Sequence, residues 1–304
     1  MTSPTDRNQY RWAQRATEAA VLTALVLIGL KTWAYFATGA VTMLSSLMDS
    51  SLDCVASLVT LLAVRGAHRP ADKEHRFGHG KLEPLAGLAQ SAFIMGSASL
   101  LLMEAVQRFI TPQPVQVPAI GIGVSVAAMV ITLALVSFQR WVLTRAPSLA
   151  VEGDRLHYLS DLLTNAIVLF GLWASDFFAL PWLDPLLGLV IGAIVVRSAI
   201  DIGLRAYQGL MDREVSDAVR QKIIAIVRAA PGFAGAHDLR TRESGPDLFI
   251  QFHLELPDTL PLVDAHQISH DIEARLLAEF PRAQIIIHQD PISVVRPDLR
   301  NSAA

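Results

Sequence analysis

The sequence is poor in charged residues and almost free of cysteine. Of its 304 residues, 17% are charged, 7% are aromatic and one, Cys54, is a cysteine. A single cysteine excludes an intrachain disulfide and a site built from several thiolates, and we interpret Cys54 as a small buried apolar residue. So little charge, combined with 52% hydrophobic residues and a mean hydropathy of +0.40, is untypical of a soluble domain. These values indicate a membrane protein.

Six stretches are long and apolar enough to cross a bilayer as helices. A crossing needs roughly 20 apolar residues, and such runs occur at about 17–36, 41–64, 82–109, 117–141, 150–178 and 182–204. The first run contains no short apolar stretch that ends in a cleavage site, so we expect it to remain as an anchor. The sequence therefore predicts an α-helical membrane domain of six spans over residues 1–208.

Lysine and arginine gather on alternate connections between these spans. They lie before the first span, after the second and after the fourth, at Arg7, Arg11, Arg15, Arg65, Arg69, Lys73, Arg76, Lys81, Arg140, Arg145 and Arg155. The remaining connections contain only Arg108. Because positive charge marks the cytoplasmic side of a membrane protein, we expect both termini in the cytoplasm.

Two spans carry pairs of ionisable residues four positions apart. Asp49 and Asp53 lie in the second span, and His157 and Asp161 lie in the fifth. Side chains at this spacing share one helix face. A carboxylate in hydrocarbon is costly unless it is paired or coordinated, and three carboxylates with one imidazole suit Zn²⁺ or a similar divalent ion. Each pair alone could instead hydrogen-bond a neighbouring helix.

Smaller polar residues and one lysine accompany these pairs. Several of them fit either close helix packing or support of the ligands, namely Asn165, Ser46, Ser50, Ser57 and the small residue Ala56. Lys31 lies in the first span beside Trp33 and Tyr35. We expect its side chain to extend toward the outer interface, which would keep its charge in water.

A second candidate metal site lies in the connection after the second span. Asp72, His75 and His79 are close enough in sequence to meet at one ion, and Gly78 and Gly80 argue against a continuous helix there. A loop with charges of both signs is also typical of a solvated connection. Spacing alone leaves both interpretations open.

Residues 209–292 are expected to form a cytoplasmic α+β domain, and residues 293–304 are expected to be disordered. The order helix, strand, strand, helix, strand gives a layer of helices on a sheet. The patterns cover 215–230 and 263–280 for the helices, and 235–242, 248–256 and 283–288 for the strands.

This domain holds five of the nine histidines of the chain. They are His237, His253, His266, His270 and His288, and Asp290 follows the last. Such residues at the ends of several strands could meet and bind metal. Isolated histidines on the surface of a domain are equally compatible with the spacing.

Several of these segments together resemble the cation diffusion facilitators, in particular the bacterial branch that exports zinc and iron. The likeness runs from the first span to about Pro291, and is carried by Asp49, Asp53 and the segments 77–83, 137–141, 156–161, 210–213, 235–242 and 287–291. It implies a homodimeric antiporter of the bacterial inner membrane with a metallochaperone-like tail. Such a protein exchanges cytoplasmic Zn²⁺, or alternatively Fe²⁺ or Cd²⁺, for protons by alternating access.

The resemblance also implies roles for particular residues. The transport site would be formed by Asp49, Asp53, His157 and Asp161, and a site at the membrane–cytoplasm junction by Asp72, His75 and His79. Leu156 is a candidate gate only because it adjoins His157, and ordinary contact with lipid is the alternative. The tail would bind two ions through His237, His253, His266, His288 and Asp290, with Gln289 at the periphery. Lys81 and Asp212 would form a charge interlock near the dimer axis, whereas His68 and His270 have no counterpart in the pattern.

Two other classes of function compete with a transporter. A membrane metalloenzyme would need a general base at an open metal position, commonly within His-Glu-x-x-His, and the sequence lacks this motif. A non-transporting metal sensor would explain the histidines of the tail but would leave the ligands within the membrane without a role. The expected partners are the bilayer, a second copy of the chain, metal ions and protons. Nucleic acid is not expected, because the tail lacks a basic patch.

Overall fold

The structure is a computed structural model that describes residues 4–39, 41–111, 119–178, 183–295 and 298. The chain divides into two compact units. One is helical and contains Pro4–Gly78 and Leu82–Tyr207, while the other contains His79–Lys81 and the chain from Gln208 onward. Of residues 293–304, expected to be disordered, the structure describes only residues 293–295 and 298.

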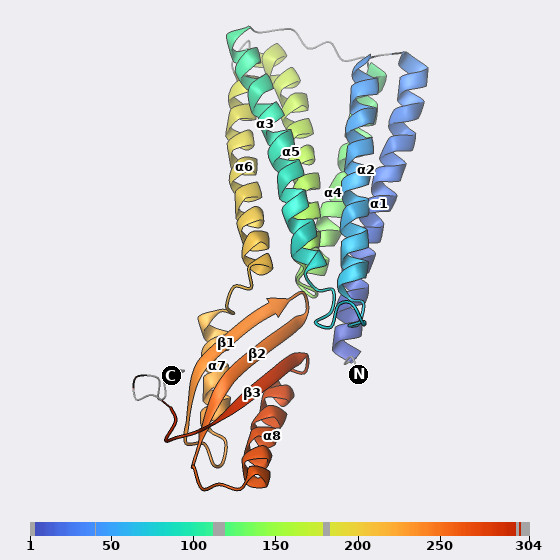
Figure 1. The fold of residues 1–304 in the computed structure, drawn as a ribbon. Coiled ribbons are helices and arrows are strands. Elements are labelled where there is room, and N and C mark those ends of the chain that lie inside the picture. The colour runs from blue at the N-terminus through green and yellow to red at the C-terminus, as the bar shows by residue number, and fades with distance from the viewer. Residues whose placement is uncertain (1–3, 40, 112–118, 179–182, 296–297, 299–304) are drawn as a thin grey trace. The chain divides into compact units, whose positions relative to one another are not determined.

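The first unit consists of long helices (Figure 1). They are α1 (Pro4–Thr38), α2 (Val41–Ala67), α3 (Leu82–Ile110), α4 (Ala119–Leu143), α5 (Leu149–Phe178) and α6 (Leu183–Leu210). Apolar runs form helices in a bilayer because the backbone must satisfy its own hydrogen bonds there. Gly39 ends α1 with a φ of 61°, which glycine adopts readily, and its N–H donates to the carbonyl of Tyr35.

Five described helices are long and apolar enough to cross a membrane. The spans are Tyr10–Thr38, Ser46–Ala67, Leu82–Gln107, Ile122–Leu143 and Pro185–Leu210. Helix α5 is not among them, and its first half carries Glu152, Asp154, Arg155, His157 and Asp161. The span expected at 150–178 is therefore a helix whose crossing of the membrane stays a prediction.

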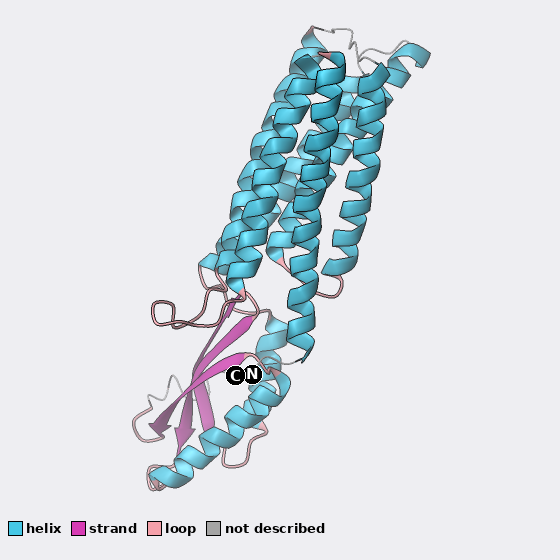
Figure 2. Ribbon diagram, turned by 90° about the vertical axis from the view of Figure 1, so that its right-hand side faces the viewer, coloured by secondary structure: helices cyan, strands magenta, loops and turns pink. Residues whose placement is uncertain are grey.

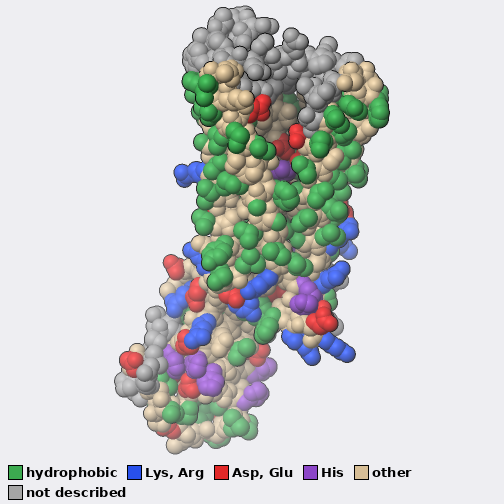
Figure 3. Space-filling model, turned by 45° about the horizontal axis from the view of Figure 1, so that its top comes forward, with side chains coloured by type: hydrophobic (Ala, Val, Ile, Leu, Met, Phe, Trp, Pro, Cys, Tyr) green, Lys and Arg blue, Asp and Glu red, His purple; other side chains and the backbone are tan. Residues whose placement is uncertain are grey.

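Small residues allow the helices of this unit to approach one another closely. Helix α1 packs on α2 and α4, and its Ala16, Ala20 and Ala24 are fully buried at four-residue spacing. A Cβ atom added to Gly192 on α6 would come 2.5 Å from the side chain of Leu102 on α3. Large apolar side chains instead cover the outside of the unit, as Figure 3 shows, which suits contact with lipid.

The second unit is an α+β domain with a three-stranded sheet (Figure 2). Its elements are α7 (Asp217–Arg228), β1 (Gly235–Ser244), β2 (Asp247–Leu256), α8 (Leu262–Glu279) and β3 (Ala283–Pro291). The strand order is β1-β2-β3, with β1 antiparallel and β3 parallel to β2. The predicted fold class, a helical membrane domain followed by an αββαβ domain, is confirmed.

The alternation of side chains along β2 separates a core face from a polar face. Ile250, Phe252 and Leu254 are at most 1% exposed and belong to the cluster that includes Ile223 of α7 and Ile272 of α8. Successive residues of a strand point to opposite faces. His253 and Glu255 therefore lie on the face of the sheet that the helices do not cover.

Candidate metal centres

The first cluster of metal-ligating side chains joins α2 to α5. His157 Nε2 lies 2.9 Å from Asp53 Oδ1 and 3.7 Å from Asp161 Oδ2. Ligand atoms of these three residues all lie within 4.8 Å of one another, so a single ion could contact all of them. The four-residue spacing places His157 and Asp161 on one face of α5, and Asp53 meets them from α2.

Two polar atoms of this cluster are buried and have no hydrogen-bond partner within the described residues. His157 is 5% exposed, and its Nδ1 has no hydrogen-bond partner within the described residues. Asp161 Oδ2 is also buried and accepts no hydrogen bond from that part of the chain. Acidic and histidine side chains are visible in a hollow among apolar side chains of the helical unit (Figure 3). Buried polar atoms normally have a partner, so these two atoms remain available to a bound ion. Carboxylate oxygens and an imidazole nitrogen are ligands that suit a divalent cation.

Asp49, the fourth predicted ligand, lies one turn before Asp53 on α2. Its side chain is exposed, and it is not part of the three-residue group. It shares the helix face of Asp53 because of its spacing. The structure thus brings together three of the four residues predicted for the transport site and leaves the fourth beside them.

A buried carboxylate that the sequence analysis did not single out lies one turn from His157. Asp154 of α5 is 0% exposed, and it accepts hydrogen bonds from Ser57 Oγ at 2.9 Å and Gln139 Nε2 at 2.8 Å. Gln90 Nε2 lies 3.4 Å from the same carboxylate. These partners come from α2, α4 and α3, so Asp154 joins four helices. The signal was present in the sequence, since Asp154 precedes His157 by three positions and shares its helix face.

The expectation that Lys31 extends toward the outer interface is wrong. Its Nζ donates to Ser50 Oγ at 2.6 Å and to the carbonyl of Ser46 at 3.1 Å, both on α2. The ammonium group needs hydrogen-bond acceptors, which water at the interface would supply. Here the hydroxyl of Ser50 and the carbonyl of Ser46 supply them inside the unit. Lys31 is therefore held against the helix that carries Asp49 and Asp53.

The second cluster lies on the polar face of the sheet in the C-terminal unit. The strand register pairs His237 of β1 with His253 of β2, and His253 with His288 of β3. The three imidazoles form a row, with ring centroids 4.9 Å apart for the first pair and 4.6 Å for the second. Ligand atoms of His237, His253 and Asp290 lie within 4.8 Å of one another.

Asp290 is the centre of this row. Its carboxylate lies 2.7 Å from His253 Nδ1, 3.2 Å from His288 Nε2 and 3.5 Å from His237 Nε2. Glu255, which no sequence pattern singled out, is buried and accepts a hydrogen bond at 3.0 Å from Nδ1 of His237. A carboxylate that holds the second nitrogen of a histidine orients the ring for a metal. The strand period could have indicated it, because Glu255 lies two residues after His253.

Other residues predicted for the tail site face elsewhere. Gln289 donates from Nε2 to Ser269 Oγ at 2.8 Å and to the carbonyl of Ala265 at 3.2 Å, so it points toward α8. His266 stacks on His270, with ring centroids 6.4 Å apart, and neither belongs to the group formed by His237, His253 and Asp290.

Two family models match this chain over nearly its whole length. The cation efflux transmembrane domain matches residues 18–211, and the cytoplasmic domain of cation efflux proteins matches residues 215–292. The chain belongs to the cation efflux family. The resemblance inferred from the sequence is thereby confirmed, and the C-terminal unit corresponds to the cytoplasmic domain of that family.

Similar cation efflux proteins are known from bacteria. The cation-efflux pump FieF of Cronobacter sakazakii is 50% identical over 94% of this chain and 95% of its own length. FieF of Salmonella arizonae is 48% identical over 95% of this chain and 96% of its own. A solved structure of CzrB, studied as a zinc transporter, is 32% identical over 25% of this chain and 96% of its own, with a TM-score of 0.24.

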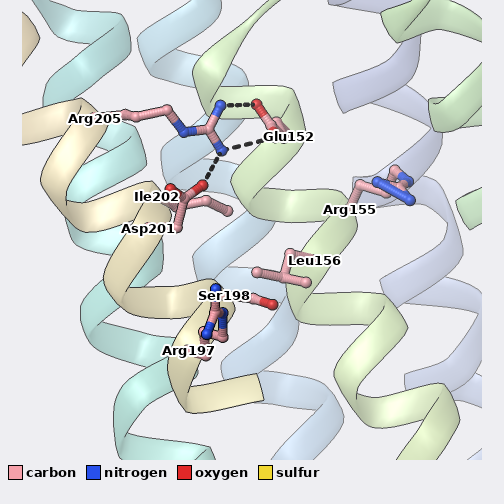
Figure 4. Close-up of a pocket in the computed structure, with 8 residues that line it drawn as sticks. All are labelled: Glu152, Arg155, Leu156, Arg197, Ser198, Asp201, Ile202 and Arg205. Atoms are coloured by element: carbon pink, nitrogen blue, oxygen red, sulfur yellow. Dashed lines mark hydrogen bonds and ion pairs between the residues drawn. The ribbon is translucent and has the colours of Figure 1, made fainter. Parts of the chain in front are cut away.

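A polar cavity of about 340 Å³ lies between α5 and α6 of this cation efflux chain (Figure 4). At one end, Arg205 donates two hydrogen bonds of 2.8 Å to Glu152 and lies 3.1 Å from Asp201. Leu156, the candidate gate, directly precedes His157 in the chain and lines the cavity. It also packs against an apolar cluster of α3 and α6 that includes Ile94. Its side chain is therefore in contact with protein.

The connection after α2 is folded locally around Asp72. Its Oδ1 accepts hydrogen bonds from the backbone N–H of Glu74 and His75, and lies 3.3 Å from Nδ1 of His75. His79, the third residue predicted for the junction site, belongs to the other compact unit. The site of Asp72, His75 and His79 stays a prediction.

Lys81 and Asp212 form an ion pair within the second unit, at 3.0 Å. Lys81 also donates to the carbonyl of Leu210, and Arg242 lies 3.2 Å from the same Asp212 carboxylate. Partial burial would raise the pKa of Asp212, but the hydrogen bond from Lys81 and the charge of Arg242 outweigh it and hold that pKa below its usual value. The position of this pair relative to a dimer axis stays a prediction.

Proposed function

We propose that this chain exports divalent metal cations from the cytoplasm in exchange for protons, with zinc as the principal substrate. The observation that carries the proposal is the cluster of Asp53, His157 and Asp161, which joins two helices of a membrane unit in a cation efflux protein. Ionisable residues at membrane depth mark substrate pathways by default. The relatives named as cation-efflux pumps support the direction of transport.

The coupling to protons follows from the chemistry of the ligands. A divalent metal binds carboxylates and neutral imidazole, so loading from the cytoplasm displaces protons, and protonation from the outer side weakens binding and releases the ion. Asp49 would complete the set as the fourth ligand. Alternating access would expose the site to one side at a time, with Leu156 helping to separate it from the cytoplasm.

The donor set limits the choice of ion without fixing it. Three carboxylates and one imidazole accommodate Zn²⁺, Fe²⁺ and Cd²⁺, and the general order of affinities does not choose among them. A purely thiolate-binding ion would not fit, because the cluster contains no sulfur.

The proposal also covers the assembly of the protein. The chain would form a homodimer in the bacterial inner membrane with both termini in the cytoplasm, and the pair of Lys81 and Asp212 would lie near its axis.

Two further metal sites belong to the proposal. The row of His237, His253, His288 and Asp290 would bind metal in the cytoplasm, and His266 would join it if α8 shifts. Asp72, His75 and His79 would bind a further ion at the junction.

Zinc flux into proteoliposomes under an imposed pH gradient tests the proposal. We expect flux that reverses when the gradient is reversed and that is abolished in Asp49→Ala, Asp53→Ala and Asp161→Ala. Asp201→Asn, an exposed acid of α6 outside the cluster, is the matched control and should retain flux. Zinc binding without flux in the native chain would instead favour a metal sensor.

A further inference from the structure

Lys31 lies on α1, and its side chain contacts the face of α2 that carries the acidic residues. Its anchors, Ser46 and Ser50, and the ligands Asp49 and Asp53 follow the spacing i, i+4, i+3 and i+7, which defines a single helix face. Ser50 is 1% exposed, so the ammonium group is bound to a buried hydroxyl. The charge of Lys31 acts on Asp53, Asp49 and Asp161, the three carboxylates of the transport site.

A charge count shows what this lysine changes. Three ionised carboxylates contribute three negative charges, and the ammonium group of Lys31 reduces the sum to two. One divalent ion then makes the site neutral. Net charge at membrane depth is strongly unfavourable, so a site of this composition matches one divalent ion better than a monovalent or a trivalent one.

We propose that Lys31 is a fixed counter-charge of the transport site, which sets its preference for divalent ions and keeps their binding weak enough for release. The inference rests on the proposed transport function. The lysine binds no substrate; it acts through the electrostatic field at Asp49, Asp53 and Asp161. Without it, the deprotonated site would carry three negative charges and would attract any cation more strongly, and a carrier must release its substrate as well as bind it.

The concentration dependence of zinc flux tests this role. Lys31→Gln keeps a hydrogen-bond donor for Ser46 and Ser50 but removes the charge, Lys31→Met removes both, and Lys31→Arg keeps the charge. We expect the apparent affinity for zinc to increase at least about tenfold in Lys31→Gln and Lys31→Met, because a nearby positive charge has been removed. The maximal rate should fall because release becomes slower, and Lys31→Arg should resemble the native chain.

The change in inhibition by trivalent lanthanum between the native chain and Lys31→Gln provides a second readout of the charge at position 31. A site with three negative charges matches a trivalent ion, so lanthanum should compete with zinc more effectively in Lys31→Gln than in the native chain. Unchanged apparent affinity and unchanged lanthanum inhibition in Lys31→Gln would overturn the inference. Equal weakening of zinc transport in Lys31→Gln and Lys31→Arg would also overturn it, since it would show a role in packing only.

Asp53→Ala separates a failure of this inference from a failure of the proposed function. If zinc flux in the native chain does not depend on Asp53, the transport site itself is misplaced. If flux depends on Asp53 but is insensitive to the charge at position 31, only the role of Lys31 is wrong.

Discussion

At the scale of single residues, short electrostatic contacts hold the central histidine of each cluster. His157 lies between two carboxylates of the membrane cluster, and His237 lies between Glu255 and Asp290 in the cytoplasmic domain. In both cases a carboxylate contacts a ring nitrogen and fixes the orientation of the imidazole. Such contacts would orient the rings for the proposed metal ions, and the same carboxylates and imidazoles can also bind protons.

Asp212 provides a prediction about pH. Its pKa is lower in the folded chain than in the unfolded one, so its pairing with Lys81 and Arg242 stabilises the fold at neutral pH. This contribution is lost as the pH falls through the lowered pKa. Asp212→Asn should therefore reduce the unfolding temperature of the full chain at neutral pH but not well below pH ~3.9, the usual aspartate value.

The effect of Asp212→Asn should be under about 1 kcal/mol, because the side chain of Asp212 is 43% exposed and its ion pairs are screened. Asparagine tolerates the φ of 55° at this position, so the substitution isolates the charge. A difference from the native chain that is the same at both pH values would show that charge is not the cause.

At the scale of elements, the register of strands and helices decides which side chains meet. One antiparallel and one parallel pairing place His237, His253 and His288 abreast across three strands. The bulge between His237 and Arg240 shifts the register of β1 immediately after the first histidine. Gly245, with a φ of 57°, forms the turn before β2, and Gly80 approaches it so closely that a Cβ there would lie 2.0 Å from the carbonyl of Ser244.

The junction of α2, α3, α4 and α5 around Asp154 yields a prediction about stability. Asp154→Ala would leave the buried amide of Gln139 without its acceptor, while the hydroxyl of Ser57 would keep only Tyr158 Oη, 3.0 Å away. An unsatisfied buried group costs about 1–3 kcal/mol, so thermal unfolding in detergent should occur at a clearly lower temperature.

Asp154→Asn is the matched variant and should be milder. It keeps one acceptor oxygen, and Gln139 Oε1, which has no partner within the described residues, could turn to accept the new amide. Equal destabilisation by alanine and asparagine would contradict this account of the network.

At the scale of the whole molecule, the chain combines a membrane unit and a cytoplasmic unit that each contain a group of side chains able to hold a metal ion. Metal bound by the cytoplasmic cluster could adjust transport or only stabilise the assembly. The two roles differ in their effect on kinetics, because a regulatory site changes the concentration at which flux begins.

Flux titration of His253→Ala distinguishes these two roles. If the cytoplasmic cluster regulates transport, this variant should need more zinc for half-maximal flux while its maximal rate changes little. His270→Ala is the matched control, since His270 is 64% exposed and lies outside the group. An unchanged zinc concentration for half-maximal flux in His253→Ala would contradict the regulatory role.

Much of the fold was predictable because it follows from local periodicity. Helices were expected at 215–230 and 263–280 and occur at Asp217–Arg228 and Leu262–Glu279. The last strand was expected to end at 288 but continues to Pro291, because the parallel pairing with β2 extends through Asp290. Its end depends on a partner strand far away in the sequence, which no local pattern contains.

The sequence by itself determined which residues could act together: the spacing of His157 and Asp161 assigns them to one face of α5, and the family motifs identify a cation efflux protein. Only the tertiary structure decided that Asp53 rather than Asp49 contacts His157 and that Lys31 turns inward. It also decided that Asp154 joins α5 to three other helices and that Glu255 contacts His237. The reason is physical. Periodicity fixes the face of one element, whereas a contact depends on how neighbouring elements pack and on which buried acceptors remain for each charge.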